Sequence, residues 1–152
     1  MAAPRAHLAR APAREALIDI QFEPRLPIEA VQAFAKLAEP EFRRNLDLWE
    51  SVIGFGTAGG APGASATNTP IGKRLDSKDP PHVLQCRVNG FTFSRLSPYG
   101  RWEDLRFEAH RWWTSFRSAV HPGMVTRIAV RYINEIKLPL PIGDFSEFLT
   151  SP

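Results

Sequence analysis

The sequence has little that could build a reactive centre. Its 152 residues include a single cysteine, Cys86, so no intrachain disulfide and no cysteine cluster for zinc can form. None of its four histidines stands in a His-x-x-x-His or His-Glu-x-x-His spacing. No apolar run approaches the roughly 18 residues that a membrane span requires. We therefore expect no metal, no cofactor and no membrane segment, and the lone cysteine fits a reducing cytoplasm.

A strong excess of charge is also missing from most of the chain. Nineteen basic and sixteen acidic side chains give a net charge of +3. The first 16 residues hold three of the basic ones, Arg5, Arg10 and Arg14, against Glu15 alone. The remaining 16 basic and 15 acidic side chains leave the rest of the chain close to neutral. A strong electrostatic footprint for nucleic acid is therefore not evident, although net charge does not exclude a local basic face.

Length and composition predict one soluble α+β domain, since 43% hydrophobic and 23% charged residues lie in the ordinary globular range. Residues 1–14 predict a disordered tail, with a faint likeness to a transit peptide as the alternative, and residues 15–152 a single domain. Residues 54–81 are rich in glycine and predict a flexible surface loop, either functional or disordered. The G-x-G-x-x-G match at residues 54–59 lacks the following helix that a dinucleotide site needs.

Residues 84–96 predict a β-hairpin that turns at Asn89-Gly90, the dipeptide that a type I′ turn favours. Counting outward from this turn pairs Cys86 with Phe93 and Arg87 with Thr92. The first pair then faces the core and the second pair faces away from it. A buried Cys86 is expected to be an inert thiol rather than a nucleophile.

Hydrophobic periodicity predicts strands at residues 16–22 and 125–138 and amphipathic helices at 28–38 and 102–120. A second helical piece at 41–49 and a weak strand at 51–55 are further expectations. The order indicates a ferredoxin-like plait, β-α-β-β-α-β, with two helices on one face of an antiparallel sheet. Its open face would carry Asp19, Gln21, Gln85, Arg87, Thr92, Ser94, Arg127, Arg131 and Glu135.

Two stretches carry a resemblance to a known pattern. The run RVNGFTFSRLSPYGRW from Arg87 to Trp102, followed by Trp112 and by VRYINEI at residues 130–136, resembles a sporadically distributed bacterial family of uncharacterised proteins. The opening EALIDI run at residues 15–20 is similar to that family's first strand. The resemblance covers residues 12–149, and family members usually continue into a further C-terminal segment. The family brings no established activity, cofactor or catalytic residue, so the resemblance implies none here.

The first functional hypothesis is a cytoplasmic interaction or accessory module without catalytic activity. It would act through the open sheet face or the 54–81 loop, on a protein partner or on a second copy in a homodimer. A sporadic family of this kind could also belong to a mobile or defence-related cassette. No complete catalytic motif is present, which favours this hypothesis and leaves enzyme activity uncertain.

Two other hypotheses use particular side chains. Arg87, Arg127 and Arg131 could form a basic stripe that contacts the phosphates of a nucleic acid, or could instead be neutralised by acidic neighbours on the same face. Alternatively, Arg131, Tyr132 and Asn134 could centre a small-molecule site or an unfamiliar enzyme. Asn134 shares the parity of the core-facing residues, so it would have to find partners for a buried amide, for example in a neighbouring loop, unless a β-bulge interrupts the strand there.

Overall fold

The structure is a computed structural model that describes residues 11–58, 61–77, 79–138, 141, 143–144 and 146. Within these residues, six strands, two α-helices and a short 3-10 helix follow one another along the chain. The strands are β1 (Ala13–Glu23), β2 (Arg44–Ala58), β3 (Ala61–Asp76), β4 (His82–Arg87), β5 (Gly90–Leu96) and β6 (Met124–Asn134). The helices are α1 (Ile28–Ala38), the 3-10 helix η1 (Glu39–Glu41) and α2 (Trp102–Val120).

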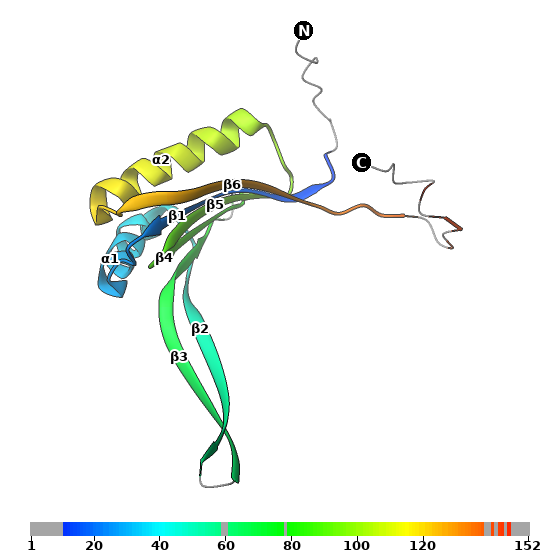
Figure 1. The fold of residues 1–152 in the computed structure, drawn as a ribbon. Coiled ribbons are helices and arrows are strands. Elements are labelled where there is room, and N and C mark those ends of the chain that lie inside the picture. The colour runs from blue at the N-terminus through cyan, green and yellow to red at the C-terminus, as the bar shows by residue number, and fades with distance from the viewer. Residues whose placement is uncertain are drawn as a thin grey trace.

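The six strands form one antiparallel sheet in the order β2-β3-β4-β5-β1-β6, with both α-helices on one face (Figure 1). The predicted α+β class is therefore confirmed. The predicted β-α-β-β-α-β order is not matched, because β2 and β3 add two strands between α1 and β4. Residues 28–38 and 102–120 form helices with the predicted bounds.

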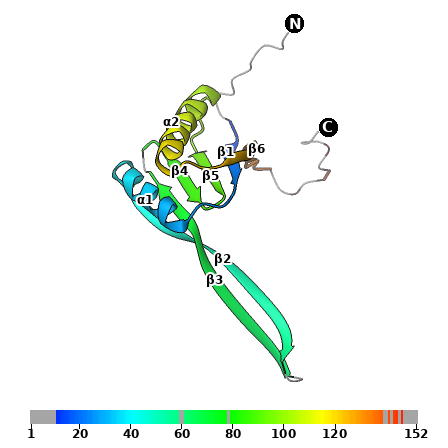
Figure 2. The same cartoon turned by 60° about the vertical axis from the view of Figure 1, so that its left-hand side comes forward.

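A long hairpin of β2 and β3 projects beyond the rest of the sheet, and we call it the arm (Figures 1 and 2). The predicted helical piece at 41–49 is wrong, because residues 44–49 belong to β2, and the predicted strand at 51–55 lies within β2. The predicted surface loop at 54–81 is wrong for residues 54–58 and 61–76, which form strands. Ladder pairs run from Arg44 and Asp76 at the base to Ala58 and Ala61 at the tip. Cross-strand pairing satisfies the backbone of a glycine-rich segment that has few apolar side chains to bury.

The first and last strands differ slightly in length from the predicted ones. β1 begins at Ala13, so the last two residues of the predicted 1–14 tail belong to a strand, and residues 1–10 lie outside the described residues. β6 ends at Asn134 rather than at residue 138.

The hydrophobic core lies between the helices and the face of the sheet that they cover. The rings of Phe34 from α1 and Phe116 from α2 meet edge to face, with their centroids 5.1 Å apart. Alternate residues of β1, β4 and β5 reach this core from the sheet, as the strand periodicity predicts. The residues that the helices bury are Val31, Phe34, Ala35, Ala38, Leu105, Ala109, Trp112 and Phe116.

The hairpin of β4 and β5 forms, but its register differs by two residues from the predicted one. Arg87 pairs with Gly90, so Val88 and Asn89 are the two turn residues. Asn89 does not adopt the positive φ that a type I′ turn requires. Gly90 instead sits in a tight space, because a Cβ there would lie 2.8 Å from Arg87 Nη2 and 3.2 Å from the carbonyl oxygen of Ile20 on β1.

Tertiary hydrogen bonds explain why the observed turn lies one residue earlier in the chain than the predicted one. The backbone N–H of Val88 donates to Ile71 at 2.8 Å, and its carbonyl accepts from Leu26 at 2.7 Å. The Val88 side chain is also buried in the core. These contacts outweigh the local preference of Asn89-Gly90 for the turn positions. A shift of two residues conserves parity, so Cys86 and Phe93 still face the core as predicted.

β6 is an edge strand, and among the described strands it pairs only with β1. Ile128 stands opposite Ile20, Val130 opposite Ile18 and Tyr132 opposite Ala16, which places these three residues of β6 on the helix side. The sequence predicts these residues in the core, and that prediction is wrong. Ile128, Val130 and Tyr132 are 67%, 49% and 44% exposed. The physical reason is that α2 packs over β5 and β1, which leaves the side chains beyond β1 uncovered.

Replacing Phe116 by alanine tests the core. The ring is fully buried against Phe34, so Phe116→Ala should lower the free energy of unfolding by about 3–5 kcal/mol. Phe107→Ala on the same helix is the matched control, because Phe107 is exposed and its loss should cost less than about 0.5 kcal/mol. Urea denaturation followed by circular dichroism measures both, and equal losses would contradict this assignment of the core.

Candidate functional site

The sheet face that points away from the helices holds an open cavity of about 320 Å³, and Asp19 of β1 is among the residues that line it. The Asp19 carboxylate accepts hydrogen bonds from Thr92 Oγ1 and from Arg87 Nη2, each at 2.7 Å. Its second oxygen lies 3.7 Å from Arg127 Nη1. The Arg87 guanidinium also donates to Thr92 Oγ1 at 3.0 Å, which closes a three-membered polar network. The residues around the cavity are Leu17, Asp19, Gln21, Gln85, Arg87, Asn89, Thr92, Arg127 and Arg131.

This network holds Asp19 in its charged form. Burial by itself raises the pKa of the Asp19 carboxyl. The hydrogen bonds from Thr92 and Arg87, together with the charges of Arg87 and Arg127, outweigh burial and leave the pKa below its ordinary value. The side chain of Asp19 is only 13% exposed, so these contacts are poorly screened by solvent.

The structure brings Arg87, Arg127 and Arg131 together around this cavity, in agreement with the predicted basic stripe. Asp19 engages two of the three arginines, whereas Arg131 has no ion-pair partner among the described residues. Three arginines against one aspartate leave the cavity with a net charge of +2. Glu135, which the sequence placed on this face, pairs instead with Arg14 at 2.9 Å and with Lys137 at 3.9 Å.

Two polar residues of this face are less accessible than the sequence predicts. Thr92 and Ser94 point away from the helices as their parity requires, but both are buried. Thr92 is enclosed by Asp19 and Arg87, which are bonded to it. Ser94 lies in register between Leu17 of β1 and Val83 of β4, and its hydroxyl has no hydrogen-bond partner among the described residues.

Arg131, Tyr132 and Asn134 do not form a common site. Arg131 and Tyr132 lie on opposite faces of β6, and the Tyr132 hydroxyl is 3.1 Å from that of Tyr99. Asn134 is exposed at the end of β6, opposite Ala13, so the prediction of a buried amide is wrong. A register shift separates its pairing with Ala13 from the next ladder pair at Glu15, and the strand ends there.

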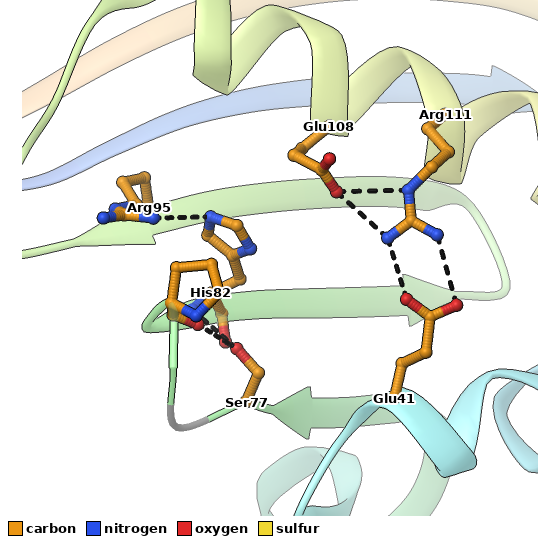
Figure 3. A network of polar contacts seen from close by, with 7 residues as sticks. Glu41, Ser77, His82, Arg95, Glu108 and Arg111 are labelled. Carbon is orange, nitrogen blue, oxygen red and sulfur yellow. Dashed lines mark hydrogen bonds and ion pairs between the residues drawn. The ribbon is translucent and has the colours of Figure 1, made fainter.

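A second cavity, of about 550 Å³, was not predicted from the sequence. It lies between η1, the β3–β4 connection, the end of β5 and the first half of α2 (Figure 3). One wall is an ion-pair cluster in which Arg111 donates two hydrogen bonds to Glu41, at 3.1 and 2.9 Å, and two to Glu108, at 3.1 and 3.0 Å. The guanidinium also lies 4.4 Å from the centre of the Trp112 ring. Arg111 therefore fastens η1 to α2.

His82 stands on the opposite wall of this cavity in its neutral form. Arg95 Nη1 lies 3.0 Å from His82 Nε2. Because a guanidinium can only donate, Nε2 must accept, and the proton of the neutral ring is on Nδ1. Burial is the largest cause that lowers the pKa of His82, and the positive charge of Arg95 lowers it further. The ring packs against Phe93, with centroids 4.9 Å apart.

Neither Ser77 nor Cys86 is arranged as a nucleophile. The Ser77 hydroxyl accepts the backbone N–H of His82 at 2.9 Å and donates to the carbonyl of Pro80, so it stabilises a turn (Figure 3). The imidazole of His82 is held by Arg95 instead of activating Ser77. Cys86 is fully buried, and burial raises the pKa of its thiol. Within the described residues, no group of three or more histidine, cysteine or acidic side chains could hold a metal ion.

Comparisons with protein-family models, with curated proteins and with solved structures found no match to this chain. Among the described residues, no helix is long and apolar enough to cross a membrane. The site geometry is therefore the basis for the functional argument.

Replacing Asp19 by asparagine tests the polar network. A depressed carboxyl pKa in the folded state stabilises the fold above the unfolded-state pKa, and this stability is lost as the pH falls through the folded-state pKa. Asp19→Asn should therefore cost about 1–3 kcal/mol at pH 7 and progressively less as the pH is lowered below about 4. Asp47→Asn, which breaks a more exposed ion pair with Lys73, should cost less than about 1 kcal/mol. Urea titrations across pH measure both, and a pH-independent loss at Asp19 would contradict the network.

A titration of His82 by NMR tests its neutral state. Because burial and Arg95 both disfavour the imidazolium, the midpoint should lie below the ordinary value of about 6.5. Arg95→Gln removes one of these two causes, so it should raise the midpoint without restoring it fully. The same shift makes the fold less stable as the pH falls through about 6.5, since the unfolded chain binds more protons. A midpoint at or above 6.5 in the unaltered protein would show that the ring is not held neutral.

Proposed function

We propose that this protein is an interaction module that binds a protein partner along β6 and has no catalytic role. The single observation that carries this proposal is the free edge of β6. The strand has 11 residues and, among the described strands, pairs on one side only. An unpaired edge offers a row of backbone N–H and C=O groups to an added strand.

The composition of β6 supports the proposal. Exposed edge strands are usually protected by short length, by proline or by lysine. β6 is long, residues 124–134 contain neither proline nor lysine, and the two charged side chains of the strand, Arg127 and Arg131, both line the open-face cavity. Its helix-side row, Ile128, Val130 and Tyr132, remains exposed in the single chain. Apolar surface of this kind next to a free edge is typical of a protein-binding surface.

A catalytic role has less support, because the candidate reactive side chains already have structural partners. Ser77 stabilises a turn, His82 is held by Arg95, and Cys86 is enclosed in the core. Nucleic-acid binding is the second candidate, favoured by the +2 charge of the sheet-face cavity. It ranks second because Asp19 already occupies Arg87, and because the aromatic side chains of β5 are buried on the helix side and cannot stack bases.

We also propose that the fold is a ferredoxin-like plait with the arm inserted between α1 and β4. The neighbour order β4-β5-β1-β6 supports this, since it remains when β2 and β3 are left out. The arm is a second candidate contact surface, because Trp49, Val52 and Ile53 are all exposed along β2.

Selection from a library of displayed random peptides tests the proposed function. Peptides enriched on the unaltered protein should bind Ile128→Lys at least about tenfold more weakly, because the new charge stands in the centre of the apolar row. Leu37→Lys on α1 is the matched control, since Leu37 is 66% exposed and Ile128 is 67% exposed. Binding to the control should be unchanged. The proposal fails if no enriched peptide distinguishes Ile128→Lys from Leu37→Lys.

A further inference from the structure

We infer that the segment accepted by β6 is an extended strand with two acidic residues four positions apart on one face and two apolar residues between them on the other. Its pattern is acidic, apolar, any residue, apolar, acidic. This inference rests on the proposed function and specifies the chemistry of its partner.

The two rows of β6 set the pattern. Arg127 and Arg131 point to the open sheet face, where both line the cavity around Asp19. Ile128 and Val130 point to the helix side. A residue directly opposite on an added strand shares the face of its partner. Acidic side chains therefore belong opposite the two arginines and apolar side chains opposite Ile128 and Val130. The pattern reads the same in both directions, so it does not depend on strand polarity.

The charge of the open face calls for acidic residues in particular. Among the described residues that line the cavity, Asp19 is the only acidic one, and its carboxylate is 2.7 Å from Arg87. Arg127 lies at the longer distance of 3.7 Å from Asp19, and its side chain is 50% exposed. Arg131 has no ion-pair partner among the described residues. An acidic residue opposite Arg131 therefore supplies a counter-charge that the described part of the chain lacks.

A second copy of this chain fits the edge less well than such a segment. An antiparallel β6–β6 pair that matches all 11 residues places residue 124 opposite 134, and so Arg127 opposite Arg131 on both sides of the twofold axis. Shifting this register by two residues brings Arg127 or Arg131 diagonal to its own copy. Like charges in these positions destabilise a sheet. An offset of one residue separates the arginines but places one of them opposite the apolar row of the other copy, for example Arg131 opposite Ile128. A heterologous acidic segment meets no such repulsion.

Fluorescence anisotropy with three labelled peptides and the full chain tests the inference. The acidic peptide has the core Thr-Glu-Val-Thr-Val-Glu-Thr, and the basic peptide has lysine in place of both glutamates. The scrambled peptide, Glu-Glu-Val-Val-Thr-Thr-Thr, keeps the composition of the acidic one. The acidic peptide should bind at least about tenfold more tightly than either of the others. Ile128→Lys should abolish this binding, and Leu37→Lys should preserve it.

Charge reversal on the protein gives the decisive comparison. Arg127→Glu combined with Arg131→Glu should invert the preference, so that the basic peptide binds more tightly than the acidic one. Arg131→Glu alone should lose the preference for the acidic peptide. This single variant leaves the Asp19 network in place, so it serves if the double variant does not fold.

The outcomes separate this inference from the proposed function. If the acidic and basic peptides bind equally and Ile128→Lys abolishes both, the edge binds peptides but the charge pattern is wrong. If neither the acidic nor the basic peptide binds, while the selected random peptides still bind Ile128→Lys more weakly than the unaltered protein, the inference alone fails. If the selected random peptides also bind Ile128→Lys as tightly as the unaltered protein, the proposed function fails together with the inference. Self-association of the full chain in sedimentation, lost in Ile128→Lys, would assign the edge to a second copy. If a single-stranded RNA 20-mer binds more tightly than the acidic peptide, and Arg131→Glu abolishes that binding, the open sheet face is assigned to nucleic acid.

Discussion

Two helices cover one face of a sheet that has six strands, and the rest of the structure follows from the mismatch in width. Strands lie about 4.8 Å apart and an α-helix with its side chains is about 10 Å wide, so two helices cover about four strands. α1 packs over β3 and β4, and α2 packs over β5 and β1. The strands at the two edges are left without cover. On one edge the uncovered strand is β2, which belongs to the arm, and on the other it is β6 with its apolar row exposed.

The local parts of this fold were predictable because they depend on periodicity. Both α-helices have the predicted bounds, and the inward and outward parity of β1, β4, β5 and β6 is as predicted. The lateral position of a strand has no local signal. Ile20 of β1 and Ile128 of β6 stand side by side and read alike in sequence, yet one is buried and the other exposed. Most of the arm was missed for a related reason, since among its described residues only its base, at Ile71 and Leu75, contributes apolar side chains to the core, and cross-strand pairing holds the rest of its length.

The two candidate sites differ in the same respect, because one depends on strand periodicity and the other on contacts between distant residues. Parity alone predicted that Arg87, Arg127 and Arg131 gather near Asp19, because side-chain direction alternates regularly along a strand. The cavity around His82 depends on contacts that parity does not encode. Glu41 and Arg111 are 70 residues apart. The hydrogen bond between Arg95 and His82 was missed because the predicted hairpin register placed Arg95 opposite Leu84, two residues away from its observed partner.

Arg127 and Arg131 also limit how a long edge strand, unpaired on one side among the described strands, can pair with its own copies. A flat apolar edge pairs readily with other copies of itself, and proteins commonly prevent this with charged side chains on the edge strand. Where two copies of β6 pair with their helices on the same side of a shared sheet, these arginines stand opposite or diagonal to arginines of the other copy, and the like charges repel. The same two charges attract a strand whose acidic residues have that spacing. The discrimination between partners thus comes from repulsion of the wrong strand as much as from attraction of the right one.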